Sequence, residues 1–192
     1  MSYPVYQHIL PTRADHVAPG RHAVVLGINP GAAGEFSAPA RAWLRNAAEL
    51  TFGLCETFTL AELFDEPAHD VRSIPPAEMS RRVRDNASAI QALIEREAPR
   101  IVFQIGFECE NFTRDVYGLR PDGDTVQRPQ SSGRLLVPYR RGPTPWIVMM
   151  HFAAKGYGHA DARVAHDHAW HILEDRNQPT TVAGFSPGSG AT

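Results

Sequence analysis

The sequence predicts an α/β protein, a three-layer α/β/α sandwich around a central, mostly parallel sheet. Short apolar runs alternate along the chain with segments in which apolar residues recur every three or four positions. Strands that are separated by helices pair in parallel, because the chain must cross over to return to the same end of the sheet. The 192 residues suffice for one such domain, and 43% hydrophobic and 21% charged residues are ordinary for a globular chain.

The individual elements follow from local patterns. The expected strands are five apolar runs at residues 23–28, 57–64, 100–106, 135–139 and 146–150. The expected helices have apolar stripes on one face and cover residues 39–50, 75–98, 109–118 and 162–173. Proline marks the start of the first two helices, and Pro99 and Gly118 mark two of the ends.

Residues 1–177 are expected to form a single domain, followed by a flexible tail at 178–192 that is rich in small and polar residues. The first twenty residues hold three prolines and little periodicity, which predicts a wrap over the surface. Residues 119–134 are polar and contain two prolines and two glycines, so we expect a long loop there.

Composition excludes several classes of protein. No run approaches the roughly 18 apolar residues of a membrane span, and the N-terminus lacks the apolar stretch of a signal peptide. A cytoplasmic monomer with no membrane partner is therefore expected. Cys55 and Cys109 are too few for a disulfide framework or a four-thiolate metal site, and no metal or organic cofactor is implied. A net charge of −2 means that any DNA partner must be recognised by a local site.

A glycine-rich run, Gly27-Ile28-Asn29-Pro30-Gly31, directly follows the first predicted strand. Ligands of open α/β sheets bind beyond the carboxyl ends of the strands, which is where this run lies. The glycines permit a close approach of the backbone to a ligand, and the Asn29 amide could hold a water. An ordinary turn between a strand and a helix explains the run equally well. The glycine spacing matches neither the dinucleotide fingerprint nor the P-loop.

This run resembles the first motif of the uracil-DNA glycosylase superfamily, in particular its mismatch-specific uracil/thymine branch and its single-strand-selective branch. Residues 36–43 (FSAPARAW) are similar to the stretch of the mismatch-specific branch in which a Phe stacks on the base. Residues 149–156 (MMHFAAKG) occupy the position of the second motif of the superfamily, in which His151 matches and the next two residues differ. The resemblance covers about residues 23–175 and implies a uracil-DNA glycosylase-like fold.

The resemblance implies a DNA base glycosylase that hydrolyses the N-glycosidic bond of uracil, or of a related deaminated base, flipped out of DNA. Asn29 would position the attacking water, Phe36 would stack on the base, and His151 would donate a hydrogen bond to a carbonyl oxygen of the leaving base. Lys155 or Tyr157 would contact phosphate or wedge into the duplex. The backbone that would line the base pocket is that of Gly27, Ile28, Pro30 and Gly31.

Glu62 is a departure from the family. Many members have an Asn at the end of the second core strand to read the base, whereas this chain has Glu62 within LAELF. An ionised carboxylate only accepts hydrogen bonds, so Glu62 would repel O4 of uracil and accept from an exocyclic amine or a ring N–H. A position on a solvent-exposed face is the alternative. The best local basic patch for phosphate contacts is Arg134, Arg140 and Arg141, around a strand that we expect near the site.

Two alternative functions stay open. One is a non-catalytic nucleic-acid or nucleotide-binding module of the same fold, and the other is an N-glycoside hydrolase that acts on a small molecule. The acidic balance and the altered residues after His151 favour both. His168 and His171 have the spacing to share a metal on a helix. A polar helix surface is the better interpretation of this His-rich segment.

Overall fold

All the strands that the structure describes belong to one sheet. The computed structural model describes residues 6–9, 22–28, 38–64 and 70–175. The strand order is β1-β3-β2-β4-β8-β7-β5, and β6 pairs with β7. The strands are β1 (Tyr6–Ile9), β2 (His22–Gly27), β3 (Thr57–Glu62), β4 (Ile101–Ile105), β5 (Arg120–Pro121), β6 (Val126–Gln127), β7 (Arg134–Arg141) and β8 (Thr144–Met149).

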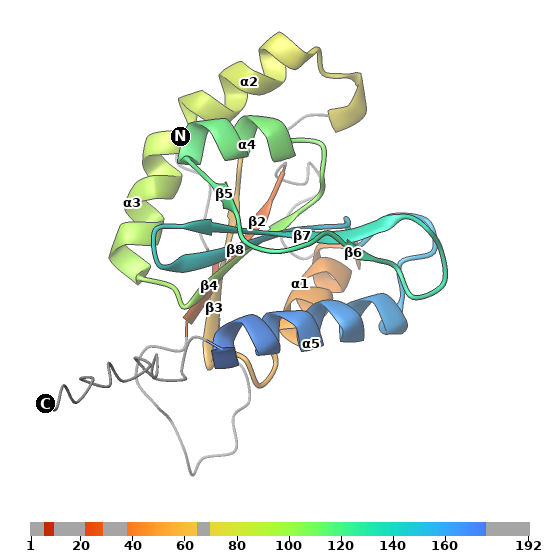
Figure 1. The fold of residues 1–192 in the computed structure, drawn as a ribbon. Helices are drawn as coiled ribbons and strands as arrows, with labels where there is room; N and C mark the ends of the chain where they lie inside the picture. The colour runs from red at the N-terminus through yellow and green to blue at the C-terminus, as the bar shows by residue number, and fades with distance from the viewer. Residues whose placement is uncertain (1–5, 10–21, 29–37, 65–69, 176–192) are drawn as a thin grey trace, which may run out of the picture.

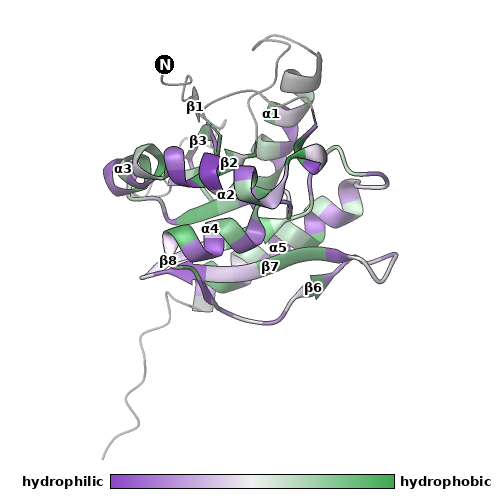
Figure 2. Ribbon diagram, turned by 90° about the horizontal axis from the view of Figure 1, so that it is seen from above, coloured by the Kyte–Doolittle hydropathy of each residue, from purple (hydrophilic) through white to green (hydrophobic). Residues whose placement is uncertain are grey.

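Helices cover both faces of this sheet, which confirms the predicted three-layer arrangement (Figure 1). On one side lie α1 (Ala38–Thr51) and α5 (His159–Asp175). On the other lie α2 (Pro76–Asp85), α3 (Ala87–Glu97) and α4 (Glu110–Tyr117), with a short 3-10 helix, η1 (Val71–Ser73), before α2. Hydrophobic colour follows the central strands, while α2 and α3 carry hydrophilic residues on their outer surfaces (Figure 2).

The centre of the sheet is the parallel set β3-β2-β4-β8. Every residue of β2 and β4 is buried, because helices cover both faces. Val25 and Phe103 pack toward α1 and α5, whereas Val24 and Val102 pack toward α2, α3 and α4. Strands buried on both faces appear in sequence as continuous apolar runs, which is why these strands were predictable.

The helix expected between Pro75 and Pro99 is in fact two helices, α2 and α3, which meet at Asn86. Asn86 has φ −94° and ψ 0°, outside regular helical geometry. Its side-chain Nδ2 donates to the backbone oxygen of Glu62 at 2.9 Å. Such a side-chain to backbone bond competes with helix continuation, and here it fastens the break to the end of β3.

Two predictions about irregular segments were wrong. The first twenty residues include β1, which pairs antiparallel with β3. The segment 119–134 contains β5 and β6, both of which pair with β7. Strands of two residues have no recognisable alternation, so sequence patterns do not reveal them. The expected tail at 178–192 lies outside the described residues. Within the described part of the chain, no helix combines the length and the apolar character that crossing a membrane requires.

Candidate functional site

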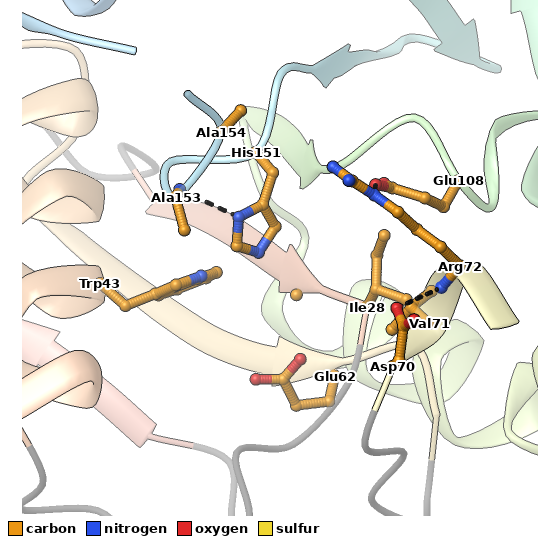
Figure 3. Close-up of a pocket in the computed structure, with 11 residues that line it drawn as sticks. Ile28, Trp43, Glu62, Asp70, Val71, Arg72, Glu108, His151, Ala153 and Ala154 are labelled. Atoms are coloured by element: carbon orange, nitrogen blue, oxygen red, sulfur yellow. Dashed lines mark hydrogen bonds and ion pairs between the residues drawn. The ribbon is translucent and has the colours of Figure 1, made fainter. Parts of the chain in front are cut away.

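A cavity of about 260 Å³ opens where β2, β3 and β8 end. These strands are parallel, so their carboxyl ends meet at one edge of the sheet, where α/β proteins bind ligands. Four of the residues singled out from the sequence line this cavity: Gly27, Ile28, Glu62 and His151 (Figure 3). Segments that are distant in sequence therefore converge at the predicted place.

Gly27 and Glu62 are partners in the pairing of β2 with β3. A methyl group on Gly27 would lie 2.1 Å from Oε2 of Glu62 and 2.8 Å from Oε1. The missing side chain is therefore what allows the carboxylate to lie across the end of β2. The sequence suggested Gly27 for its close approach to a ligand. The structure shows that the group that it accommodates belongs to the protein itself.

Gly106, at the end of β4, also leaves room for neighbouring side chains. Its φ of +114° is a conformation that residues with a side chain rarely adopt. A methyl group there would lie 2.4 Å from Cδ1 of Ile28 and 2.8 Å from Oε2 of Glu108, and both of these residues line the cavity. The positions of Ile28 and Glu108 in the cavity wall thus depend on the absence of a side chain at Gly106.

His151 follows β8 by two residues, and its ring is oriented by its own loop. The backbone N–H of Ala153 donates to Nδ1 at 3.0 Å, so Nδ1 is an acceptor and the neutral ring carries its proton on Nε2. Burial lowers the pKa of His151 below its ordinary 6.5, opposed by Glu108 and reinforced by Arg72. At neutral pH the ring is therefore uncharged, with an N–H group that can be donated to a ligand.

Trp43 is a cavity residue that helical periodicity does not distinguish from the other apolar residues of α1. It is half-buried and lines the cavity beside His151 and Glu62 (Figure 3). Its ring meets that of Phe152 edge-on, with centroids 5.5 Å apart, which fixes its orientation. An indole face on a cavity wall can stack on a flat ring. In the sequence, the one feature that could have indicated this role is that Trp43 is an aromatic residue in the second turn of the helix after the glycine-rich run.

The remaining charges of the cavity are mostly acidic. Asp70 and Glu108 line it together with Glu62, and Arg72 is its one guanidinium group among the described lining residues. The backbone N–H of Arg72 donates to Asp70 at 3.0 Å, and its side chain lies 3.7 Å from Glu108. The Arg72 side chain is 78% exposed, so it extends from the rim into solvent. The interior therefore favours hydrogen-bond donors, while phosphate would be met only at the rim.

The loop after His151 carries the two residues expected to touch DNA. Lys155 is exposed, as that role requires. Tyr157 is not a projecting wedge: it packs on Phe152 with ring centroids 5.4 Å apart, and burial raises the pKa of its hydroxyl. The prediction for Tyr157 is wrong in this respect, because the aromatic residue extends the core beneath the loop.

The same loop is fastened by Arg128, from the segment between β6 and β7. Its Nε and one terminal nitrogen donate to the two carboxylate oxygens of Asp161 at 3.0 and 2.9 Å, and it also donates to the backbone oxygen of Gly156. Asp161 in turn accepts from the backbone N–H of Gly158 at 3.1 Å. The loop that orients His151 is thus connected to the rest of the fold by a two-pronged ion pair.

Arg140 and Arg141 lie away from the cavity, contrary to the predicted basic patch. β7 runs antiparallel to β8, and Arg141 pairs with Thr144 at the start of β8. The six residues of β8, roughly 20 Å of strand, separate that point from the cavity. Arg134 is at the nearer end of β7, but it is 2.9 Å from the carboxylate of Glu110. The three arginines therefore form no common phosphate site.

Four of the predicted site residues, Asn29, Pro30, Gly31 and Phe36, lie outside the described residues, so their roles stay predictions. Two histidines of α5 contact α1 or the residue that follows it. His159 lies 2.8 Å from Glu49, and His166 lies 2.8 Å from the backbone oxygen of Phe52. In the described ranges, no group of three His, Cys, Asp or Glu side chains is arranged to hold a metal ion.

No protein-family model matches the chain, and no curated protein matches its sequence. The resemblance to the glycosylases consequently depends on the two short motifs alone.

Proposed function

We propose that this protein is a DNA base glycosylase that hydrolyses the N-glycosidic bond of uracil or a related deaminated base. One observation carries the proposal. Gly27 and Ile28 of the first motif, Glu62 at the next strand end and His151 of the second motif all line one cavity. Parallel pairing brings these three segments to one edge of the sheet, and residues of both motifs line the cavity that opens there.

The residues suit the chemistry of base removal. A base flipped out of DNA would enter the cavity and lie against the indole of Trp43. As the bond from C1′ to the base nitrogen breaks, its electron pair moves onto the base. Nε2–H of His151 would donate to a base carbonyl, where the negative charge grows, and a donor held in place before the reaction stabilises that charge.

The sugar left behind has oxocarbenium character and takes up the oxygen of a water, whose proton ends on the departed base. Asn29 is the predicted holder of that water. The carboxylates of Glu62, Asp70 and Glu108 line the cavity, and negative charge stabilises a cationic sugar. The acidic lining is therefore compatible with glycosidic cleavage even though DNA is an anion.

A second candidate is supported by that same lining. Three carboxylates face the cavity and its one guanidinium extends from the rim, while Arg140 and Arg141 lie at the far end of the sheet. An uncharged nucleoside would meet no electrostatic penalty on entering such a site. N-glycoside hydrolysis of a small molecule is therefore the alternative activity.

The test is excision from oligonucleotides that carry one uracil, hypoxanthine or xanthine, followed by alkali to cleave abasic sites. We expect cleavage by the wild type and a loss of about 100-fold or more in His151→Ala and Asn29→Ala. The matched control is His171→Ala, which removes an exposed histidine of α5 and should retain full activity. Undiminished cleavage by His151→Ala would refute the assigned role. Hydrolysis of free nucleosides alone would favour the second candidate, and DNA binding without cleavage would favour a non-catalytic module.

A further inference from the structure

Removal of a base by water requires a group that accepts a proton. The water that attacks C1′ keeps one proton on the new hydroxyl group and must give up the other. The amide of Asn29, which is predicted to hold this water, is not basic and cannot take that proton. His151 cannot take it either, because its Nε2 already carries the proton that it donates to the base. The remaining candidates are the carboxylates that line the cavity, namely Glu62, Asp70 and Glu108.

Two of these carboxylates are committed to contacts within the protein. Glu62 lies across the end of β2, where it packs over Gly27 and its Oε2 is buried. Asp70 caps the 3-10 helix η1, where it accepts from the backbone N–H of Arg72 at 3.0 Å. Within the described ranges, Glu108 accepts no such hydrogen bond. Its ion pair with the side chain of Arg72 joins Oε1 to Nε over 3.7 Å, which is too far for a hydrogen bond. The acceptor sites of Glu108 are therefore the ones that a water can use.

Glu108 also lies at the depth at which the sugar of a bound nucleotide would be found. A base inside the cavity and a phosphate at its rim leave the sugar between them. The side chain of Arg72, which is 78% exposed, marks the rim, and that of Glu108 is 28% exposed. Figure 3 shows the Glu108 carboxylate next to the guanidinium of Arg72. The carboxylate is thus just inside the rim, on the way from the phosphate position to the base position.

Glu108 and His151 follow neighbouring strands of the sheet. β4 pairs with β8 so that Ile105 lies opposite Met149, and the backbone N–H of Gly106 donates to the oxygen of Met149 at 2.7 Å. Neighbouring strands are about 4.8 Å apart, so the segments that follow them begin side by side. Burial lowers the pKa of His151 most strongly, and the next largest effect is that of the Glu108 charge, which raises it. A proton acceptor and a hydrogen-bond donor thus border the same end of the cavity.

The loop that carries Glu108 is held from both sides. Its neighbour Phe107 lies under the guanidinium of Arg134, with 4.3 Å from Cζ to the ring centroid. Arg134 is also 2.9 Å from the carboxylate of Glu110, which accepts from the hydroxyl of Tyr139 at 2.8 Å. The backbone N–H of Glu110 donates to the oxygen of Phe107 at 3.0 Å. These contacts give the carboxylate the fixed support that a catalytic group needs.

On the premise of the proposed glycosylase function, we propose that Glu108 is the general base that takes the proton of the attacking water. As the oxygen of the water bonds to C1′, the bond from C1′ to the base nitrogen breaks, and its electron pair moves onto the base. One proton of the water stays on the new hydroxyl group, and the other moves to Glu108. Glu108 then gives this proton to the departed base, which leaves as a neutral molecule, and the carboxylate is restored.

The experiment measures single-turnover excision rates on whichever of the uracil, hypoxanthine and xanthine oligonucleotides the wild type cleaves fastest. Glu108→Gln keeps the size of the side chain but removes the basic group. We expect its rate to fall about 100-fold or more, with little change in affinity for the oligonucleotide. Glu108→Asp keeps a carboxylate and should lose less of the rate. The control, Glu95→Gln, changes a carboxylate of α3 with 71% exposure and should retain the wild-type rate.

Azide distinguishes a general base from a group with a structural role. In Glu108→Ala the missing side chain leaves space for a small anion, and azide attacks C1′ without a proton to lose. We expect azide to raise the rate of this variant about tenfold or more, because the step that Glu108 assists is no longer needed. The product should be a sugar azide, which mass spectrometry detects. The wild type should not be accelerated by azide.

The outcomes separate this inference from the function on which it rests. A wild-type rate in Glu108→Gln, or an alanine variant that azide does not accelerate, would overturn the role of Glu108 and leave the glycosylase standing. If the wild type excises no base, the glycosylase proposal fails, and the same variants are compared on free inosine and uridine. Nucleoside hydrolysis that is lost in Glu108→Gln would support Glu108 as the base. Hydrolysis that the substitution leaves unchanged, or no hydrolysis by the wild type, would overturn it.

Discussion

The substitution Gly27→Ala tests the geometry of the cavity most directly. The added methyl group would lie 2.1 Å from Oε2 of Glu62, about 1.3 Å short of the 3.4 Å at which ordinary contact begins. The obstructing atoms belong to the end of a flexible side chain, so the carboxylate should swing away while the backbone of β2 stays in place.

The expected effects on stability and activity are therefore very different. Replacing a strand glycine with alanine gains roughly 0.5–1 kcal/mol, which offsets part of the cost of moving the carboxylate. The net change should stay within about 1 kcal/mol, or roughly 2–4 °C in Tm for a chain of this size. A catalytic or binding group displaced by about 1 Å can cost on the order of 100-fold in rate, so kcat/KM should fall much further than stability.

The assay pairs thermal melting with the excision rate on the oligonucleotide that the wild type cleaves fastest. Gly158→Ala is the matched control, since a methyl group at Gly158 meets no atom within 4 Å and should change neither quantity. A wild-type excision rate in Gly27→Ala would refute the role that we give to the Glu62 carboxylate in the cavity. A loss of several kcal/mol in stability would refute it too, because the backbone rather than the side chain would then be absorbing the clash.

Two further expectations follow from the loop that carries His151. Burial holds the pKa of His151 below 6.5, and the Ala153 N–H that donates to Nδ1 opposes protonation of that atom. We therefore expect kcat/KM to stay level down to about pH 6.5 and to decline only at lower pH. A decline that begins above pH 7 would contradict the neutral ring. Arg128→Ala removes both hydrogen bonds to Asp161 and the one to Gly156, so Tm should fall and amide hydrogen exchange should accelerate in this loop. Arg128→Lys keeps the positive charge but loses the paired guanidinium hydrogen bonds, so its Tm and exchange rate should lie between those of the wild type and Arg128→Ala. Unchanged hydrogen exchange in Arg128→Ala would show that the ion pair does not hold the loop.

The sequence was informative where burial dictates composition. β2 and β4 are covered on both faces, and their unbroken apolar runs marked them clearly. It was uninformative where a distant contact decides the local structure. Asn86 interrupts a well-patterned helix because its side chain bonds to Glu62, 24 residues earlier in the chain. No window of helical periodicity contains that partner.

The candidate site shows the same division. The positions of Gly27, Glu62 and His151 at or just after the ends of three predicted parallel strands were enough to place them at one edge of the sheet. Helical periodicity identified the inward face of α1, but it cannot say whether Trp43 on that face meets the core or a cavity.

Arg140 and Arg141 were misplaced because the expected strands at 135–139 and 146–150 left six residues between them, whereas only Gly142 and Pro143 separate β7 from β8. A two-residue connection implies an antiparallel hairpin, which puts the residues before it at the opposite end from His151.

The cavity also explains how an acidic site could serve a nucleic-acid substrate. Side chains of Ile28, Glu62 and Glu108 line it, and they pack closely over the strand ends where Gly27 and Gly106 have no side chains. Its walls carry carboxylates that match N–H donors and a cationic sugar, neither of which bears a phosphate. The exposed cations of this edge, Arg72 and Lys155, lie at the rim and in the loop after His151. In the proposed glycosylase, base recognition inside and phosphate recognition outside would thus be separate in space, and the negative lining would not have to bind the anionic backbone.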